Sequence, residues 1–280
     1  MKSINSILII LLLCISTTVS AGVPKRIITL GTVITETTDA LGFGKSIVAT
    51  DVTSEYPAYV KQLPKVSRNR AVSVEGLMQF SPDLVLALEG DISKTVVLQL
   101  KKAGIKLVTI QQEYSVKGAE KMIRTVANAL EVPAKGEELI KISNEKVQQA
   151  LQKVKANNKK SQKVLFVYAR GAGNMTIAGK GTNIDAMIEL AGGKNAVQEF
   201  ASFKPYSTEA LIKANPDVIL LFDFGVSSLG GSESILKMPG VALTNAGKNK
   251  KIVSVNGPLM VGFSSRLGDA IIDLHTKIYQ

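Results

Sequence analysis

A segment that occurs twice constrains the fold of this chain more than any other sequence feature. Residues 73–90 and 207–224 follow one pattern at a constant offset of 134 residues: a serine, a glutamate two positions later, a Pro-Asp pair and an apolar run. Serine favours the N-cap of a helix, Pro-Asp a turn, and a continuous apolar run a strand buried on both faces of a parallel sheet. The repeat therefore predicts two β/α units of one design.

Four more apolar runs accompany the repeat, two in each half of the chain. They occupy residues 26–30, 105–110, 163–167 and 251–255. Because strands that alternate with helices form parallel sheets, we predict an α/β fold with two lobes, each a parallel sheet flanked by helices. The lobes are expected at residues 22–133 and 162–280.

Between the expected lobes, residues 134–161 carry apolar residues at helical spacing among Lys, Glu and Gln. This stretch contains no proline, and its only glycine is Gly136. It predicts one uninterrupted amphipathic helix of about 20 residues, or roughly 30 Å. Such a helix would join the lobes more stiffly than a hinge rich in Gly and Ser. The alternative is a surface helix within one continuous domain.

The N-terminal segment has the pattern of a secretory signal peptide. Lys2 precedes an apolar run at residues 7–15, and small residues follow up to Ala21, so we expect cleavage after Ala21. The run is shorter than the roughly 20 residues that span a bilayer. A competing interpretation makes Cys14 a lipidation site, but the bulky Leu13 before it and the brief basic region argue against this. We expect an exported protein located in the periplasm.

Composition excludes several classes of function. The chain has one Cys and one His, His275, and a net charge of +11. Intrachain disulfides and multi-histidine metal sites are therefore impossible, and a hydrolase triad would have to use His275 as its base. The lysines are dispersed and form no nucleic-acid-binding module. We expect a protein that is not an enzyme and binds no nucleic acid.

Several local motifs resemble the helical-backbone, or class III, periplasmic binding proteins of ABC importers, which carry cobalamin, iron-siderophores or haem. Within that group the chain is most similar to the haem-binding proteins of haem-uptake operons. The resemblance covers roughly residues 25–278. The matching motifs are Asp51–Pro57, Leu63–Val66, Ser73–Gly76, Arg170–Asn174, Ala178–Thr182 and Leu190–Ala196.

The resemblance implies that haem b, as transported cargo, binds in the cleft between the lobes. Open α/β sheets place ligands at the carboxyl ends of their strands. Basic side chains in the expected cleft loops would meet the haem propionates through charge-assisted hydrogen bonds. The candidate contacts are Arg68, Arg70, Tyr168, Arg170, Lys204, Tyr206, Met260 and Arg266. An iron-siderophore or cobalamin is the alternative cargo.

The sequence departs from the family at the position of the axial iron ligand. After Leu-Pro-x-Val the family usually has Gly-Tyr-x-Arg, whose Tyr ligates ferric iron, whereas this chain has Arg68 at the Tyr position. A guanidinium has no free lone pair and cannot replace a phenolate on iron. The substitutes that we rank first are Tyr206 and Tyr168. The other candidates are Tyr56, Tyr59, Met175 and Met260.

The resemblance also implies a partner. Family members present one Glu on each lobe to the paired permease subunits of the importer, and Glu75 and Glu209 match these positions. Alternatively, each Glu only favours the N-terminus of its own helix, an effect of about 0.3–1 kcal/mol. We expect a monomer that contacts the membrane only through the permease.

Overall fold

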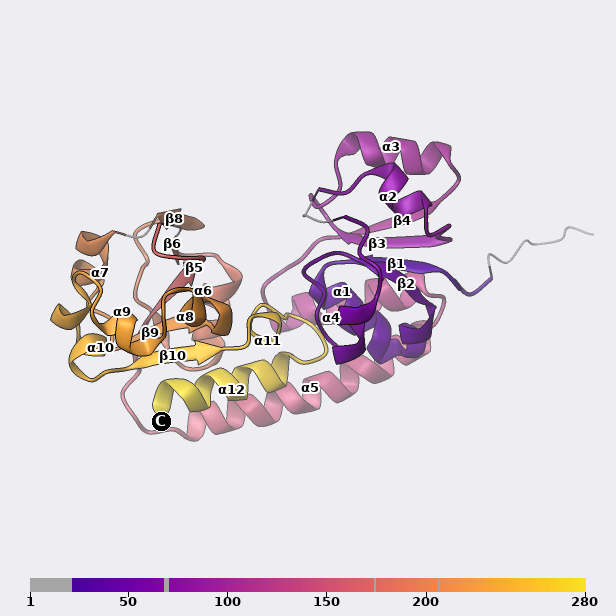
Figure 1. Ribbon diagram of the computed structural model, residues 1–280. Coiled ribbons are helices and arrows are strands. Elements are labelled where there is room, and N and C mark those ends of the chain that lie inside the picture. The colour runs from indigo at the N-terminus through magenta and orange to yellow at the C-terminus, as the bar shows by residue number, and fades with distance from the viewer. Residues whose placement is uncertain (1–21, 68–70, 174, 206) are drawn as a thin grey trace, which may run out of the picture.

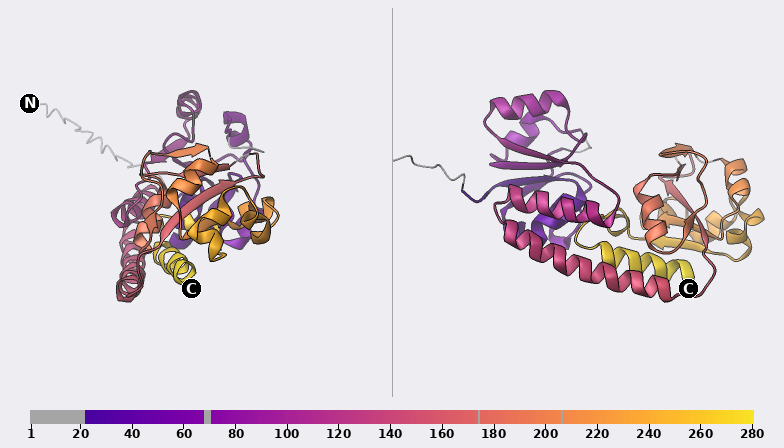
Figure 2. Two further views of the ribbon diagram at one scale, coloured as in Figure 1. Left: turned by 90° about the vertical axis from the view of Figure 1, so that its left-hand side faces the viewer. Right: turned by 180° about the vertical axis from the view of Figure 1, so that it is seen from behind.

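The computed structural model describes residues 22–67, 71–173, 175–205 and 207–280. The expected signal peptide, Arg68, Arg70 and Tyr206 lie outside these residues. Two sheets form separate lobes, and one long helix runs beneath both of them (Figures 1 and 2). The lobes of the predicted α/β fold are therefore present.

The N-terminal lobe contains a parallel sheet of four strands in the order β2-β1-β3-β4. The strands are β1 (Ile27–Leu30), β2 (Ile47–Thr50), β3 (Leu84–Leu88) and β4 (Lys106–Ile110). The helices are α1 (Thr32–Thr38), α2 (Val74–Met78), α3 (Lys94–Lys102) and α4 (Val116–Ala129). Short helical turns occur at Asp39–Phe43, Gly44–Ser46 and Ala58–Gln62. One core cluster lies between the sheet and α1 and α4, and a second between the sheet and α2 and α3.

The C-terminal lobe has the strand order β10-β9-β5-β6-β8, with β7 also paired to β5. Its strands are β5 (Lys163–Ala169), β6 (Met175–Ala178), β7 (Lys194–Asn195), β8 (Phe203–Pro205), β9 (Val218–Phe222) and β10 (Ile252–Val255). The predicted strands β5, β9 and β10 are parallel, whereas β6 and β8, which were not predicted, are antiparallel additions. The chain folds back after β5 through Gly171, whose positive φ of 87° suits a tight turn.

Short helices surround this second sheet. They are α6 (Asn183–Leu190), α7 (Thr208–Ala214), α8 (Asp223–Ser228), α9 (Ser232–Leu236), α10 (Asn245–Lys248) and α11 (Gly257–Met260), with a 3₁₀ turn at Val241–Leu243. The chain ends in α12 (Leu267–Tyr279).

The repeat is visible at the level of single residues. Ser73 and Ser207 cap α2 and α7, each accepting a hydrogen bond of 3.1 Å from the backbone N–H three residues later. Both helices end before a non-glycine residue in the left-handed region, Ser81 at φ 44° and Asn215 at φ 40°. Each of these residues precedes the proline of the Pro-Asp pair. The two units therefore share their capping serine and the left-handed residue before the proline, as well as their apolar pattern.

The aspartates of the two Pro-Asp pairs fix the neighbouring strands. Asp83 accepts a hydrogen bond of 2.8 Å from the backbone N–H of Lys25, just before β1. Asp217 accepts one of 2.9 Å from the backbone N–H of Lys163, at the start of β5. Each carboxylate thus satisfies a backbone donor at the entry of the central strand of its sheet.

The helix between the lobes is α5 (Pro133–Ala156). It begins one residue before the predicted stretch and ends five residues before residue 161, and its 24 residues span about 36 Å. Pro133 occupies the first turn, where a missing N–H costs nothing. The helix α12 lies against it (Figure 2). No helix in the described part of the chain is long and apolar enough to cross a membrane.

Candidate functional site

A pocket of about 270 Å³ lies between the two lobes. Most of its wall comes from the carboxyl ends of the four strands of the N-terminal sheet, and two residues, Asn183 and Val261, come from the C-terminal lobe. This is where parallel α/β sheets bind ligands. The lining residues are Leu30, Gly31, Thr32, Val33, Asp51, Thr53, Val72, Leu88, Asp91, Gln112, Asn183 and Val261.

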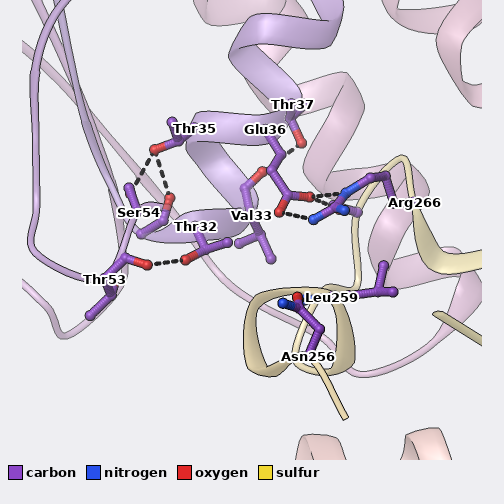
Figure 3. A network of polar contacts seen from close by, with 12 residues as sticks. Thr32, Val33, Thr35, Glu36, Thr37, Thr53, Ser54, Asn256, Leu259 and Arg266 are labelled. Carbon is purple, nitrogen blue, oxygen red and sulfur yellow. Dashed lines mark hydrogen bonds and ion pairs between the residues drawn. The ribbon is translucent and has the colours of Figure 1, made fainter. Parts of the chain in front are cut away.

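The pocket residue Asp51 accepts hydrogen bonds from the segments that follow β1 and β2. One carboxylate oxygen accepts hydrogen bonds from the backbone N–H of Gly31, at 3.0 Å, and from Ser54 Oγ, at 2.5 Å. The other oxygen accepts from the backbone N–H of Thr53, at 3.0 Å, and from its hydroxyl. Ser54 in turn lies 2.8 Å from the buried hydroxyl of Thr35 (Figure 3). These bonds hold the loops after β1 and β2 together.

Tyr168 and Arg170 form a polar pair at the end of β5. Arg170 Nε donates a hydrogen bond of 2.6 Å to the phenolic oxygen of Tyr168. The guanidinium carbon also lies 4.8 Å from the ring centre of Phe224, whose side chain is 39% exposed. A Cβ on Gly257, the first residue of α11, would be 3.7 Å from the Phe224 ring. A phenol oxygen, a cation and an exposed aromatic ring therefore meet beside the helix that leads to Val261 of the pocket.

The neighbours of the other two described tyrosine candidates differ from those of Tyr168. Tyr59 donates a hydrogen bond of 2.6 Å to Asp39, and burial together with this carboxylate raises the pKa of Tyr59. A raised pKa disfavours the phenolate that ferric iron requires. The ring of Tyr56 stacks on Arg266, with the guanidinium carbon 3.6 Å from the ring centre.

The remaining candidates are distributed over the C-terminal lobe. Met260 is 3% exposed and packs in the core of this lobe. Met175 is half-buried at the start of β6. Lys204 is exposed on β8, with its ammonium 4.7 Å from the ring centre of Phe200. Both Nε and Nη2 of Arg266 are hydrogen-bonded to the carboxylate of Glu36.

The two predicted permease contacts occupy equivalent places. Glu75 and Glu209 are exposed in the first turns of α2 and α7, two residues after the capping serines. Both carboxylates are thus accessible to a partner at the N-termini of the repeated helices.

Several pocket residues were not expected from the sequence. Thr32 and Val33 belong to the first turn of α1, which begins directly after Gly31. None of the twelve lining residues is among the predicted haem contacts. Among the described residues, no group of His, Cys, Asp and Glu could hold a metal ion.

Two α/β lobes, a pocket between them and one long connecting helix define a substrate-binding protein of class III. The chain belongs to the periplasmic binding protein family, whose family model matches residues 27–258. It is therefore an extracytoplasmic, non-enzymatic component of transport.

Curated relatives and solved structures agree on this class. The chain is 30% identical over 258 residues to YvrC, an uncharacterized ABC transporter substrate-binding lipoprotein of Bacillus subtilis, covering 91% of this chain and 80% of that one. It is 27% identical over 236 residues to the vitamin B12-binding protein of Vibrio parahaemolyticus, covering 81% of each.

Two solved structures match most of the chain. One is the periplasmic haem-binding protein BhuT in complex with two haems, with 37% identity, a TM-score of 0.87 and coverage of 91% of this chain and 97% of that one. The other is the apo form of the periplasmic haem-binding protein RhuT from Roseiflexus sp. RS-1, with 34% identity, a TM-score of 0.87 and coverage of 91% and 98%.

Proposed function

We propose that this protein captures haem b in the periplasm, after cleavage of its signal peptide, and delivers it as a monomer to a dimeric ABC permease. Two observations support this cargo: the likeness to BhuT and RhuT, and the contact of Tyr168 with Arg170 at the carboxyl end of β5, beside the exposed ring of Phe224. The pair carries the proposal, because it combines in one place the groups that ferric haem would need.

Tyr168, Arg170 and Phe224 would each have a distinct part in haem capture. The phenolate of Tyr168 would ligate ferric iron. The guanidinium of Arg170, 2.6 Å from the phenol oxygen, would neutralise the negative charge of that ligand. The exposed ring of Phe224 would pack against the flat macrocycle. Other propionate and ligand candidates, Arg68, Arg70, Tyr206 and Lys204, remain part of the proposal.

A haemin titration with matched tyrosine variants tests this proposal. The unsubstituted protein should shift the Soret band and show a tyrosinate-to-iron charge-transfer band. Tyr168→Phe should abolish that band and weaken binding by about tenfold or more, which corresponds to about 1.4 kcal/mol or more. Tyr59→Phe serves as the control, because Tyr59 already donates to Asp39, and it should leave both readouts unchanged.

Cobalamin or an iron-siderophore is the alternative cargo, and the vitamin B12-binding relative favours cobalamin. Cyanocobalamin and ferric siderophores should therefore be titrated into the same preparation. Tight binding of either, together with an unchanged haemin spectrum, would replace haem as the proposed cargo.

A further inference from the structure

A buried ion pair joins the two lobes. Glu36 lies on α1 of the N-terminal lobe, and its side chain is 1% exposed. Arg266 immediately precedes α12 and is 20% exposed. Arg266 Nε donates to Glu36 Oε2 at 2.9 Å and Nη2 donates to Oε1, so the contact is bidentate (Figure 3). Ser264 Oγ adds a hydrogen bond of 3.3 Å to the same carboxylate.

Aromatic contacts surround this ion pair. The ring of Tyr56, from the segment after β2, covers the guanidinium of Arg266 at 3.6 Å. The ring of Tyr114, which precedes α4, lies 5.6 Å from the ring of the fully buried Phe263. Residues 263–266 therefore contact three segments of the N-terminal lobe, at Glu36, Tyr56 and Tyr114.

Residues 263–266 follow the pocket residue Val261 closely in the sequence. Thr32 and Val33 of the pocket wall lie one turn before Glu36 on α1. On the opposite wall, Val261 lies five residues before Arg266 and directly after α11. Asn256 caps α11 by accepting a hydrogen bond of 3.0 Å from the backbone N–H of Leu259. The ion pair thus connects the two segments that supply these wall residues.

We propose that Glu36 and Arg266, with Tyr56 stacked on the guanidinium, are positioning residues that fix the distance between the two walls of the interlobe pocket. A bidentate contact between a guanidinium and a carboxylate is satisfied at one relative orientation of its partners. Because the carboxylate is 1% exposed, water does not compete with Arg266 for it, and breaking this pair costs more than breaking an exposed ion pair. The pair therefore restrains the lobes at a second place besides α5, whatever ligand binds between them.

The distance between spin labels on the two lobes tests this inference without any ligand. The labels would be placed at Leu98→Cys on α3 and Leu243→Cys in the C-terminal lobe, whose side chains are 61% and 62% exposed. The single native cysteine, Cys14, would be replaced by serine. The otherwise unsubstituted chain should give one narrow distance distribution by double electron–electron resonance.

Variants of the ion pair should change that distribution. Glu36→Gln removes one charge, and Arg266→Lys keeps the charge but loses the bidentate geometry, so both should broaden or shift the distances. The matched control is Lys146→Met, which breaks the exposed contact of 3.5 Å between α5 and Asp269 of α12. It should leave the distances unchanged.

Two outcomes would overturn the inference: a broad distribution in the chain with the intact pair, or distributions in folded Glu36→Gln and Arg266→Lys that equal the control. If both charge variants fail to fold, Tyr56→Ala decides the matter. Tyr56 is 42% exposed, so we expect its truncation to leave the fold intact. Loss of its stacking should broaden the distances, and an unchanged distribution would refute the restraint.

Discussion

Glu36 is a carboxyl group removed almost completely from water, and its neighbours do not fully compensate for this burial. Burial raises the pKa of Glu36 above its ordinary value of 4.5, while the hydrogen bonds and charge of Arg266 and the hydrogen bond from Ser264 act in the opposite direction. The ionised form is therefore less favourable in the folded protein than in water.

This shift predicts a pH dependence of stability. Between pH 4.5 and the raised pKa, the folded state binds more protons than the unfolded state. The contribution of Glu36 to the free energy of unfolding must therefore fall as the pH rises through that window. Urea unfolding of the unsubstituted protein and of Glu36→Gln from about pH 4 to about pH 7 isolates this contribution, because glutamine does not titrate. A stability difference that stays constant across the range would contradict the prediction.

Single residues differ in how far the sequence reveals their role. Tyr168 and Arg170 were predicted near the cleft because they follow a recognisable apolar run, and the structure adds the hydrogen bond between them. The pairing of Glu36 with Arg266 could not be predicted, since 230 residues separate the partners and only the assembled fold brings them together. The one available signal was an isolated Glu in the threonine-rich segment 32–38.

At the scale of elements, local chemistry decided what was predictable. The repeated units were found because the capping serine, the Pro-Asp pair and the apolar run are all encoded within 18 residues. Strands β6 and β8 were missed because they contain only four and three residues, and every residue of β8 is exposed. Strands that short give no hydrophobic period. The end of α5 was overestimated because the C-terminal signal of Asn157, which caps the helix, was included in the predicted stretch.

The contact between α5 and α12 yields a prediction about packing. A Cβ on Gly268 of α12 would lie 2.7 Å from the carbonyl carbon of Lys146 and 2.8 Å from the backbone nitrogen of Val147, both on α5. Gly268→Val should therefore force the helices apart and lower the free energy of unfolding by about 1–3 kcal/mol. Urea denaturation would measure the loss. Thr276→Val on an exposed position of α12 is the control and should change stability by less than about 0.5 kcal/mol. Equal effects of the two substitutions would show that the close approach is not restrictive.

At the scale of the whole molecule, the connection between the lobes determines what a partner can recognise. The lobes share α5, the packing of α12 along it and the ion pair between Glu36 and Arg266. Because these contacts oppose free rotation of the lobes, Glu75 and Glu209 would keep a defined separation. Two carboxylates at equivalent positions of a repeated unit suit a partner built from two related subunits. We therefore propose both as contacts to the permease.

The double variant Glu75→Ala with Glu209→Ala tests this docking role. It should abolish uptake of haemin by cells that carry the importer, while haemin binding to the purified protein stays unchanged, because neither residue lines the pocket. The matched control is Glu138→Ala with Glu233→Ala, which removes two exposed carboxylates, one of them also in a first helical turn. If Glu75 and Glu209 only favoured their own helices, their loss would lower stability by about 0.3–1 kcal/mol each and leave uptake intact. Uptake equal to that of the control would therefore assign both residues to helix stability and not to the permease.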